Sequence, residues 1–92
     1  MIDGPQREQV RKALLQIMCR TSTASFLVST LFDRSKDMLP DVRYGEHDIE
    51  EALAYLEGLA LVKQITGELG GYTVKWKSTQ QGVFFSERNR YI

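Results

Sequence analysis

Apolar residues in the first part of the chain recur at the spacing of an amphipathic helix. Between Pro5 and Arg20 they return every three or four positions, which places them on one face of a helix with a period of about 3.6 residues. Asp3 can cap this helix, and Pro5 suits its first turn because the N–H that proline lacks has no helical partner there. The pattern predicts a helix from about Pro5 to Arg20, with a buried stripe of Val10, Ala13, Leu14, Ile17 and Met18.

A second, denser apolar pattern predicts a helix over about Ala24–Arg34. The polar run Thr21–Thr23 precedes it, and any of these three hydroxyl side chains can accept a hydrogen bond from the free N–H groups of a first helical turn. Most of the helix circumference should be buried, because its apolar residues are Phe26, Leu27, Val28, Leu31 and Phe32.

Pro40 interrupts the pattern after the second helix. Proline cannot continue a helix, and it disfavours the helical conformation of the preceding residue, Leu39. We therefore predict a loop of roughly ten residues between Arg34 and Glu46. The loop should be ordered and packed on the domain, because it contains Met38, Leu39, Val42 and Tyr44.

A third helical pattern covers His47–Leu59. Acidic residues cluster at its start, where the helix dipole favours carboxylates. They are Glu46, Asp48, Glu50 and Glu51. The predicted inward positions are Ile49, Ala52, Leu53, Leu56 and either Leu59 or Ala60, and the outward positions are His47, Glu50, Glu51, Ala54 and Glu57.

Two strands follow, joined by a glycine-rich turn. Leu61–Thr66 and Tyr72–Lys77 have the composition of strands, and three of the five residues of Gly67–Gly71 are glycine, which adopts the positive φ angles that a tight hairpin needs. The pattern predicts a β-hairpin. In its second strand the side chains alternate, with Tyr72, Val74 and Trp76 on one face and Thr73, Lys75 and Lys77 on the other.

The last apolar pattern predicts a helix that is capped by Ser78 or Thr79 and ends near Arg90. Phe84 and Phe85 are adjacent, so they cannot both lie in one narrow stripe of this helix. We expect one of the two rings to face a partner subunit. The alternative is that both rings reach the core of a small domain.

Length and composition fit a single domain over residues 1–92. Ninety-two residues with 42% hydrophobic content can bury one modest core. Twelve Lys and Arg residues balance twelve Asp and Glu residues, so the net charge provides no overall attraction to nucleic acid or to an anionic membrane. Any binding of DNA must therefore depend on where the charges lie.

The single cysteine, Cys19, cannot form an internal disulfide and lies within the first helical pattern. We expect a buried, reduced thiol, as in a cytoplasmic protein. No apolar run approaches the roughly 18 residues of a membrane span. The first residues also lack the basic and apolar regions of a signal peptide.

The residue types argue against catalysis. His47 and Cys19 are the only residues of their kinds, and they lie on different predicted helices without a third member of a catalytic triad. A metal site needs more His or Cys residues than the chain contains. The glycine cluster lies within a hairpin, whereas a phosphate-binding loop joins a strand to a helix. We expect a protein that is not an enzyme and uses no cofactor or metal.

The order helix, strand, glycine-rich turn, strand, helix over Glu46–Arg90 resembles the core of a winged helix domain. Two segments carry the resemblance. Tyr55–Val62 is similar to the stretch where many bacterial regulators of this superfamily end their third helix, and Trp76–Gly82 to their aromatic residue followed by a Thr-x-x-Gly helix start. The resemblance implies an α+β winged helix domain with three N-terminal helices, a two-stranded hairpin called the wing, and a C-terminal helix.

The resemblance also implies a function, namely binding of double-stranded DNA as a small transcriptional regulator of bacterial or phage type. In such proteins the third helix usually enters the major groove, and the wing lies along the flanking phosphates. The lysines of the wing suit phosphate contact, since neutralised phosphates release counterions. The positions that the resemblance carries over to the DNA surface are Arg43, Tyr44, His47, Glu50, Glu51 and Ala54 for the helix, and Lys63, Lys75 and Lys77 for the wing. The loop before the third helix can add Lys36 as a backbone contact. Of these, the residues we predict to bind DNA are Lys36, Arg43, Tyr44, His47, Lys63, Lys75 and Lys77.

Charge opposes part of this interpretation. The acidic residues at the start of the third helix would be repelled by phosphates, although a glutamate can accept a hydrogen bond from cytosine. One alternative is a protein-interaction module that binds a partner through the acidic helix or through the C-terminal helix; another is that the glutamates form only a solvated face. The resemblance implies a homodimer, and the residues we expect at a dimer or partner interface are Phe84, Phe85, Arg88 and Tyr91.

Overall fold

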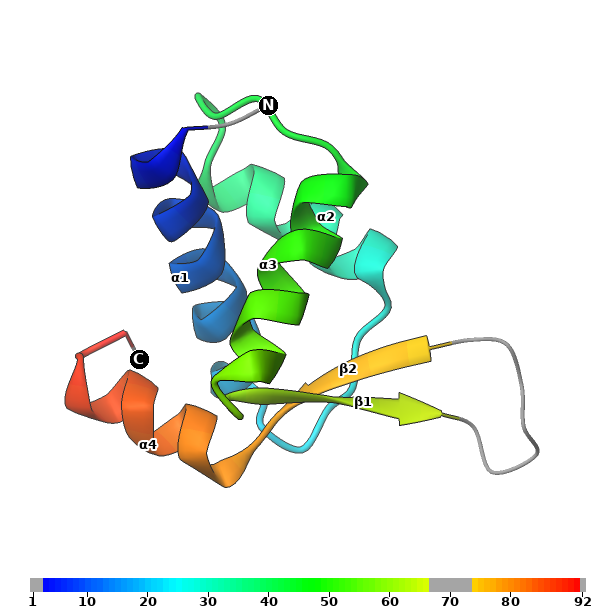
Figure 1. Cartoon of the computed structure of the whole chain (residues 1–92), viewed down its shortest axis with the longest axis vertical. Helices are drawn as coiled ribbons and strands as arrows, with labels where there is room; N and C mark the ends of the chain where they lie inside the picture. The colour runs from blue at the N-terminus through cyan, green and yellow to red at the C-terminus, as the bar shows by residue number, and fades with distance from the viewer. Residues whose placement is uncertain (1–2, 67–73, 92) are drawn as a thin grey trace.

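The computed structural model describes residues 3–66 and 74–91, and it contains every predicted helix and strand in the predicted order. Figure 1 shows α1 and α3 side by side with α2 behind them, while the hairpin projects to one side and α4 to the other. The fold class is therefore α+β, as predicted. The elements are α1 (Gly4–Arg20), α2 (Val28–Met38), α3 (Glu46–Gly58), β1 (Val62–Thr66), β2 (Val74–Ser78) and α4 (Gln80–Arg88).

Helix α1 begins and packs as its sequence predicts. The backbone N–H of Gln6 donates to Oδ1 of Asp3 over 2.9 Å, and the N–H of Asp3 donates back to the Gln6 side chain over 3.4 Å. This reciprocal capping box satisfies two N–H groups that the first turn leaves free. The predicted stripe is buried together with Leu15 and Cys19, so the expectation of a buried thiol is confirmed.

Helix α2 begins and ends about four residues later than the prediction of Ala24–Arg34. Phe26 is extended instead of helical, because it forms a β-bridge with Trp76: each backbone N–H donates to the other residue's carbonyl, over 2.8 and 2.7 Å. The predicted capping by the run 21–23 is therefore wrong, and Leu27 precedes the helix. Of the five apolar residues expected inside, Phe26 and Leu31 are buried, whereas Leu27 is 36% exposed.

The connection between α2 and α3 is shorter than predicted. It comprises the seven residues 39–45 instead of about ten, since α2 continues to Met38, two positions before Pro40. Lys36 consequently lies on α2 and not in the loop. The expectation that this loop packs on the domain is confirmed, because Val42 and Tyr44 are buried.

Helix α3 buries Ile49, Ala52, Leu53 and Leu56, as predicted. The next inward position is wrong: Leu59 is 51% exposed and Ala60 is also exposed. The helix ends at Gly58, and Ala60 adopts a φ of 61°, which turns the chain toward β1 and leaves Leu61 as the next buried residue. Within the described part of the chain, no helix is long and apolar enough to cross a membrane.

The two strands pair antiparallel, which confirms the hairpin, and their register separates two faces. Val62 is opposite Ser78, and Gln64 is opposite Trp76; this inner face contains the buried residues of the hairpin. Val74 also belongs to the inner face but is 38% exposed. The predicted turn Gly67–Gly71, and the predicted orientations of Tyr72 and Thr73, lie outside the described residues.

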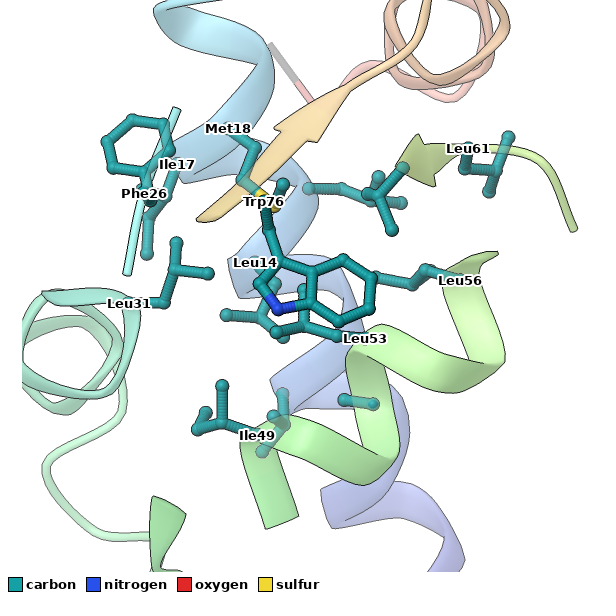
Figure 2. Packing of buried hydrophobic residues seen from close by; sticks show 14 of the residues in the cluster. Leu14, Ile17, Met18, Phe26, Leu31, Ile49, Leu53, Leu56, Leu61 and Trp76 are labelled. Atoms are coloured by element: carbon teal, nitrogen blue, oxygen red, sulfur yellow. The ribbon is translucent and has the colours of Figure 1, made fainter. Parts of the chain in front are cut away.

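The inner face of the hairpin packs against the helices. Figure 2 shows the indole of Trp76 between the side chains of Leu14 from α1 and Leu53 and Leu56 from α3. The hydroxyl of Ser78 donates to the carbonyl of Met18 over 3.2 Å, which ties the end of β2 to α1. Because the inner face is covered in this way, the outer face of the hairpin points away from α1 and α3.

A junction of four residues, Ala60, Leu61, Thr79 and Gly82, joins the end of α3 to the start of α4. The Thr79 hydroxyl caps α4 by accepting from the N–H of Gly82 over 3.0 Å, and it donates to the carbonyl of Ala60 over 2.6 Å. The N–H of Thr79 donates to the carbonyl of Leu61 over 3.0 Å. A side chain at Gly82 would place its Cβ 2.1 Å from that carbonyl oxygen, so only glycine fits there.

Candidate nucleic-acid interface

Three lysines lie together on the outer face of the wing. Lys63 is directly opposite Lys77, and Lys75 is opposite Ile65 in the hairpin register. Opposed residues of a sheet share one face, so all three ammonium groups extend from the side that the helices leave free. Lys63 and Lys75 are exposed, and Lys77 is half-buried. Among residues 3–66 and 74–91, no carboxylate lies within 4.0 Å of any of them.

A shallow groove of about 420 Å³ adjoins the lysines at the base of the wing. Lys63 and Lys77 line it together with Thr79, Gln80 and Phe84, and also Ser22, Ser78 and Val83. The first N–H groups of a helix have no intrahelical acceptor and carry a partial positive charge. The start of α4 therefore adds to the positive potential that the lysines create.

The exposed face of α3 has the opposite charge. The helix contains five acidic residues and no Lys or Arg, and Glu46, Glu50, Glu51 and Glu57 are all exposed. His47 is 81% exposed at its side chain and lies 3.0 Å from the carboxylate of Glu51, one helical turn away. The acidic surface expected from the sequence is therefore present on α3.

Tyr44 requires a correction, because it lies beneath the surface and not on it. Its side chain is 9% exposed, its hydroxyl donates to Oγ of Ser35 over 2.6 Å, and its ring meets the edge of Phe32 at 5.7 Å between centroids. Burial raises the pKa of the Tyr44 phenol above its ordinary value, and the hydrogen bond with Ser35 acts in the lowering direction. A residue fixed in this way cannot be a surface contact to DNA.

The other predicted contacts are not gathered with the wing lysines. The ammonium group of Lys36, on α2, lies 4.1 Å from the centroid of the Tyr44 ring and 5.2 Å from that of Phe32. Arg43 is exposed in the loop before α3, and His47 follows in the first turn of that helix. The start of α3 is separated from its junction with β1 by the full length of the helix, about 20 Å at 1.5 Å per residue.

The residues predicted at an interface are divided between two environments. Phe84 is 53% exposed and points away from the core, whereas Phe85 is half-buried and meets the edge of Tyr91 at 5.9 Å between ring centroids. Arg88 is exposed in the last turn of α4. The adjacent phenylalanines thus have different surroundings, and a role for the four residues in a dimer stays a prediction.

Sequence reasoning did not identify Ser22 and Gln80 as neighbours of the lysines. Gln80 has a local signal, because it follows the capping residue Thr79 at the start of α4. Ser22 has none, since it reaches the groove only through the fold. In the described ranges, no group of three or more His, Cys, Asp or Glu side chains could hold a metal ion.

Comparison with known proteins gives similarity in structure alone. No family model matches the chain, and no curated protein matches it. Three solved chains of ZitR from Lactococcus lactis are similar in fold. The apo form of a double mutant superposes with a TM-score of 0.68 at 14% identity, covering 94% of this chain and 58% of that one. The same double mutant in a second structure gives a TM-score of 0.65 at 15% identity, covering 88% and 49%.

The chain thus spans about half the length of the ZitR chains that it resembles. Identities this low show a shared architecture and nothing finer. Together with the observed order of elements, the antiparallel hairpin and the helix that follows it, the similarity establishes that this chain has a winged helix fold.

Proposed function

We propose that the protein binds double-stranded DNA as a small transcriptional regulator, with the outer face of its wing as the main contact surface. The observation that carries the proposal is the placement of Lys63, Lys75 and Lys77 on one sheet face, with no carboxylate partner among the described residues. Like charges held opposite one another destabilise a hairpin in isolation. A phosphate backbone offsets this repulsion and releases its counterions, which supplies affinity.

The contact is mainly to the DNA backbone. Lysine side chains are point charges that neutralise phosphates without distinguishing bases. The start of α4 beside Lys77 adds N–H groups and a partial positive charge, which favour a phosphate. Helix α3 contributes little, because its exposed glutamates are repelled by phosphates. Arg43 and His47, at the start of α3, are secondary contacts in this arrangement.

A salt-dependent titration tests the proposal. Anisotropy of a labelled random duplex should rise with protein at low salt, and log K should fall with log salt by about 0.9 for each phosphate contact, or by about 2.7 for three lysines. A triple variant, Lys63→Gln, Lys75→Gln and Lys77→Gln, should lose this binding. The matched single variants are Lys75→Gln on the wing, which should weaken binding, and Lys12→Gln, which removes one lysine charge from an exposed position on α1 and should bind like the wild type.

Two outcomes would contradict the proposal. One is the absence of binding at tens of micromolar protein in low salt, because non-specific affinities at physiological salt are typically 10⁻⁴ to 10⁻⁶ M and rise as salt is lowered. The other is an equal loss of affinity in Lys12→Gln and in Lys75→Gln, which each remove one exposed lysine charge. Equal loss would mean that net charge, and not the wing, determines binding.

We further propose that two copies pair through α4. Phe84 is a large aromatic residue of α4 that is 53% exposed, and pairing of two copies through α4 would remove its ring from water. Sedimentation should then show a dimer, and Phe84→Ser should shift it toward the monomer without loss of helicity. A wild-type protein that sediments as a monomer at hundred-micromolar concentration would argue against pairing.

The second candidate function is binding of a basic partner protein through α3. The observation in its favour is the exposed acidic face, on which Glu50 and Glu57 have no cationic partner among the described residues. Co-purification of a stoichiometric basic protein that is lost in Glu50→Lys with Glu57→Lys, combined with absent DNA binding, would favour this function over the first. Retention of that partner by the variant would exclude α3 as its binding surface.

A further inference from the structure

A second hollow of about 490 Å³ lies between the first half of α1, the end of α3 and the segment after α4. We call it the α1–α3 groove. Leu15, Leu56 and Leu61 line it as buried residues, and the more exposed part of its lining includes Tyr55, at 48% exposure, and Leu59, at 51%. Its volume lies within the roughly 300 to 1,000 Å³ that small-molecule sites occupy. The groove is thus large enough for a ligand and mainly apolar in its lining.

Two cations stand over aromatic rings at this groove. The guanidinium carbon of Arg11 is 3.6 Å from the centroid of the Tyr55 ring, and the ammonium nitrogen of Lys12 is 5.2 Å from that of Tyr91. The ring faces hold both cations in place by cation–π attraction. Glu8 is the acidic residue of the lining, so two positive charges and one negative charge leave a surplus of one positive charge.

Neither cation is neutralised within the described residues. No carboxylate, including that of Glu8, lies within 4.0 Å of Arg11 or Lys12. The Nε atom of Arg11 is buried and has no hydrogen-bond acceptor. This atom is covered by protein, so an anion in the groove would meet the other N–H groups of the guanidinium. A charge next to an apolar surface interacts with an anion more strongly than it would in water. Asp48 and Glu51 line a smaller hollow of about 50 Å³ together with Arg11 without contacting it. The α1–α3 groove therefore combines an apolar surface with two cations that no carboxylate contacts among the described residues.

We propose that the α1–α3 groove binds a small amphipathic carboxylate. Its carboxylate pairs with the guanidinium of Arg11 and the ammonium of Lys12, which are the charge-assisted contacts that a planar anion makes best. Its apolar body lies on Leu56, Leu59 and Leu61. A phosphate backbone does not suit this surface, because it cannot cover the leucines. None of the wing lysines lines this groove, so the site is separate from the proposed DNA surface.

The proposal is tested by titrating the isotope-labelled full chain with naphthoate and, in parallel, with naphthalenemethanol, which has the same rings and no charge. Naphthoate should give saturable NMR shifts at groove residues such as Tyr55 and Leu59, and the alcohol should bind at least about tenfold more weakly. Arg11→Gln should lower the affinity for naphthoate about tenfold. Lys77→Gln, on the outer face of the wing, is the matched control and should leave it unchanged.

Equal affinity for the acid and the alcohol would overturn the proposal, as would shifts that centre on the wing. Because Arg11 is half-buried, Arg11→Gln could fail to fold, which circular dichroism would reveal. Two exposed positions then decide the matter. Lys12→Gln should weaken naphthoate severalfold, and Leu59→Glu should abolish its binding by placing a carboxylate inside the groove. Unchanged affinity in both variants would show that the site does not bind the anion.

Discussion

The exposed face of α3 and the outer face of the wing make an instructive comparison, because one fold presents both and they differ in charge. The α3 face contains four exposed glutamates, whereas the wing face contains three lysines. Both elements rest on the same core, in which Trp76 of β2 packs against Leu53 and Leu56 of α3 (Figure 2). The fold positions two surfaces, and the exposed residues decide which of them attracts a phosphate.

The two faces stay separate because of how the hairpin packs. Val62, Trp76 and Ser78 on the inner face are buried against the helices, so the lysines extend from the opposite side. At an ionic strength of about 0.1 M the screening length is about 10 Å, so exposed charges interact only over short distances. If DNA lies on the wing as proposed, the acidic face of α3 should weaken that binding less than the neutral net charge alone would indicate.

The largest expected effect comes from a substitution in the junction where the end of α3 meets the start of α4, next to the base of the wing. Gly82→Ala brings a Cβ against the carbonyl oxygen of Leu61, a backbone atom that cannot move without displacing β1. Overpacking of this kind costs about 1 to 3 kcal/mol, and the clash with backbone places this variant at the upper end. Thermal unfolding should shift down by about 10 to 20 °C.

The matched control for that variant is the glycine of the other segment that carries the resemblance, Tyr55–Val62. A Cβ at Gly58 meets no atom within 4 Å, and this residue ends α3. Gly58→Ala should therefore be neutral or stabilising by about 0.5 to 1 kcal/mol, because alanine loses less backbone entropy in a helix. If both variants lowered the melting temperature equally, the close approach at Leu61 would not be what requires glycine at position 82.

The fold could be predicted because its signals are local. The buried stripe of α1, the capping residue Asp3 and the alternation that puts Trp76 on the inner face can all be read from neighbouring positions. The segments that carry the resemblance now have a physical role: Thr79 and Gly82 hold α4 against the end of α3. That role is structural, which explains why the resemblance identified the architecture better than the function.

Several predictions were wrong where a residue contacts another residue that lies far from it in the sequence. Phe26 pairs with Trp76, 50 positions away, and this bridge overrides the helical pattern that placed Phe26 in α2. Tyr44 was also expected to contact DNA, yet its hydroxyl donates to Ser35 of α2. The two cations of the α1–α3 groove had no signal in the sequence either, because Arg11 and Lys12 look like ordinary solvated positions until Tyr55 and Tyr91 are placed beside them.

A smaller loss of stability should follow from Tyr44→Phe. This variant tests whether the loop 39–45 before α3 belongs to the core or to the proposed DNA-binding surface. Loss of the hydrogen bond to Ser35 should cost about 1 kcal/mol at neutral pH. DNA affinity should not change, because the ring is buried. A several-fold loss of affinity in the folded variant would return this segment to the DNA-binding surface.

The pH dependence of that variant has a definite sign. Burial raises the pKa of Tyr44 above its unfolded value of 10.0, so the folded state favours the neutral phenol. Its contribution is fully present below pH 10 and is lost as pH rises through the raised pKa. Urea unfolding should therefore show wild-type stability falling toward the stability of Tyr44→Phe above pH 10. A constant difference between the two proteins across this range would contradict the assignment.

The smallest expected change in DNA affinity comes from variants of α3, and it distinguishes the α3 face from the wing most directly. In Glu50→Gln with Glu57→Gln, two carboxylates of α3 lose their charge without a change of shape. If DNA lies on the wing, its affinity should rise less than about threefold at moderate salt, because screened charges on a different face contribute little. Lys63→Gln with Lys75→Gln, the opposite change on the wing, should lower it by tenfold or more. A tenfold gain from the α3 variant would instead mean that α3 lies close to phosphates, and the wing would then be the secondary contact.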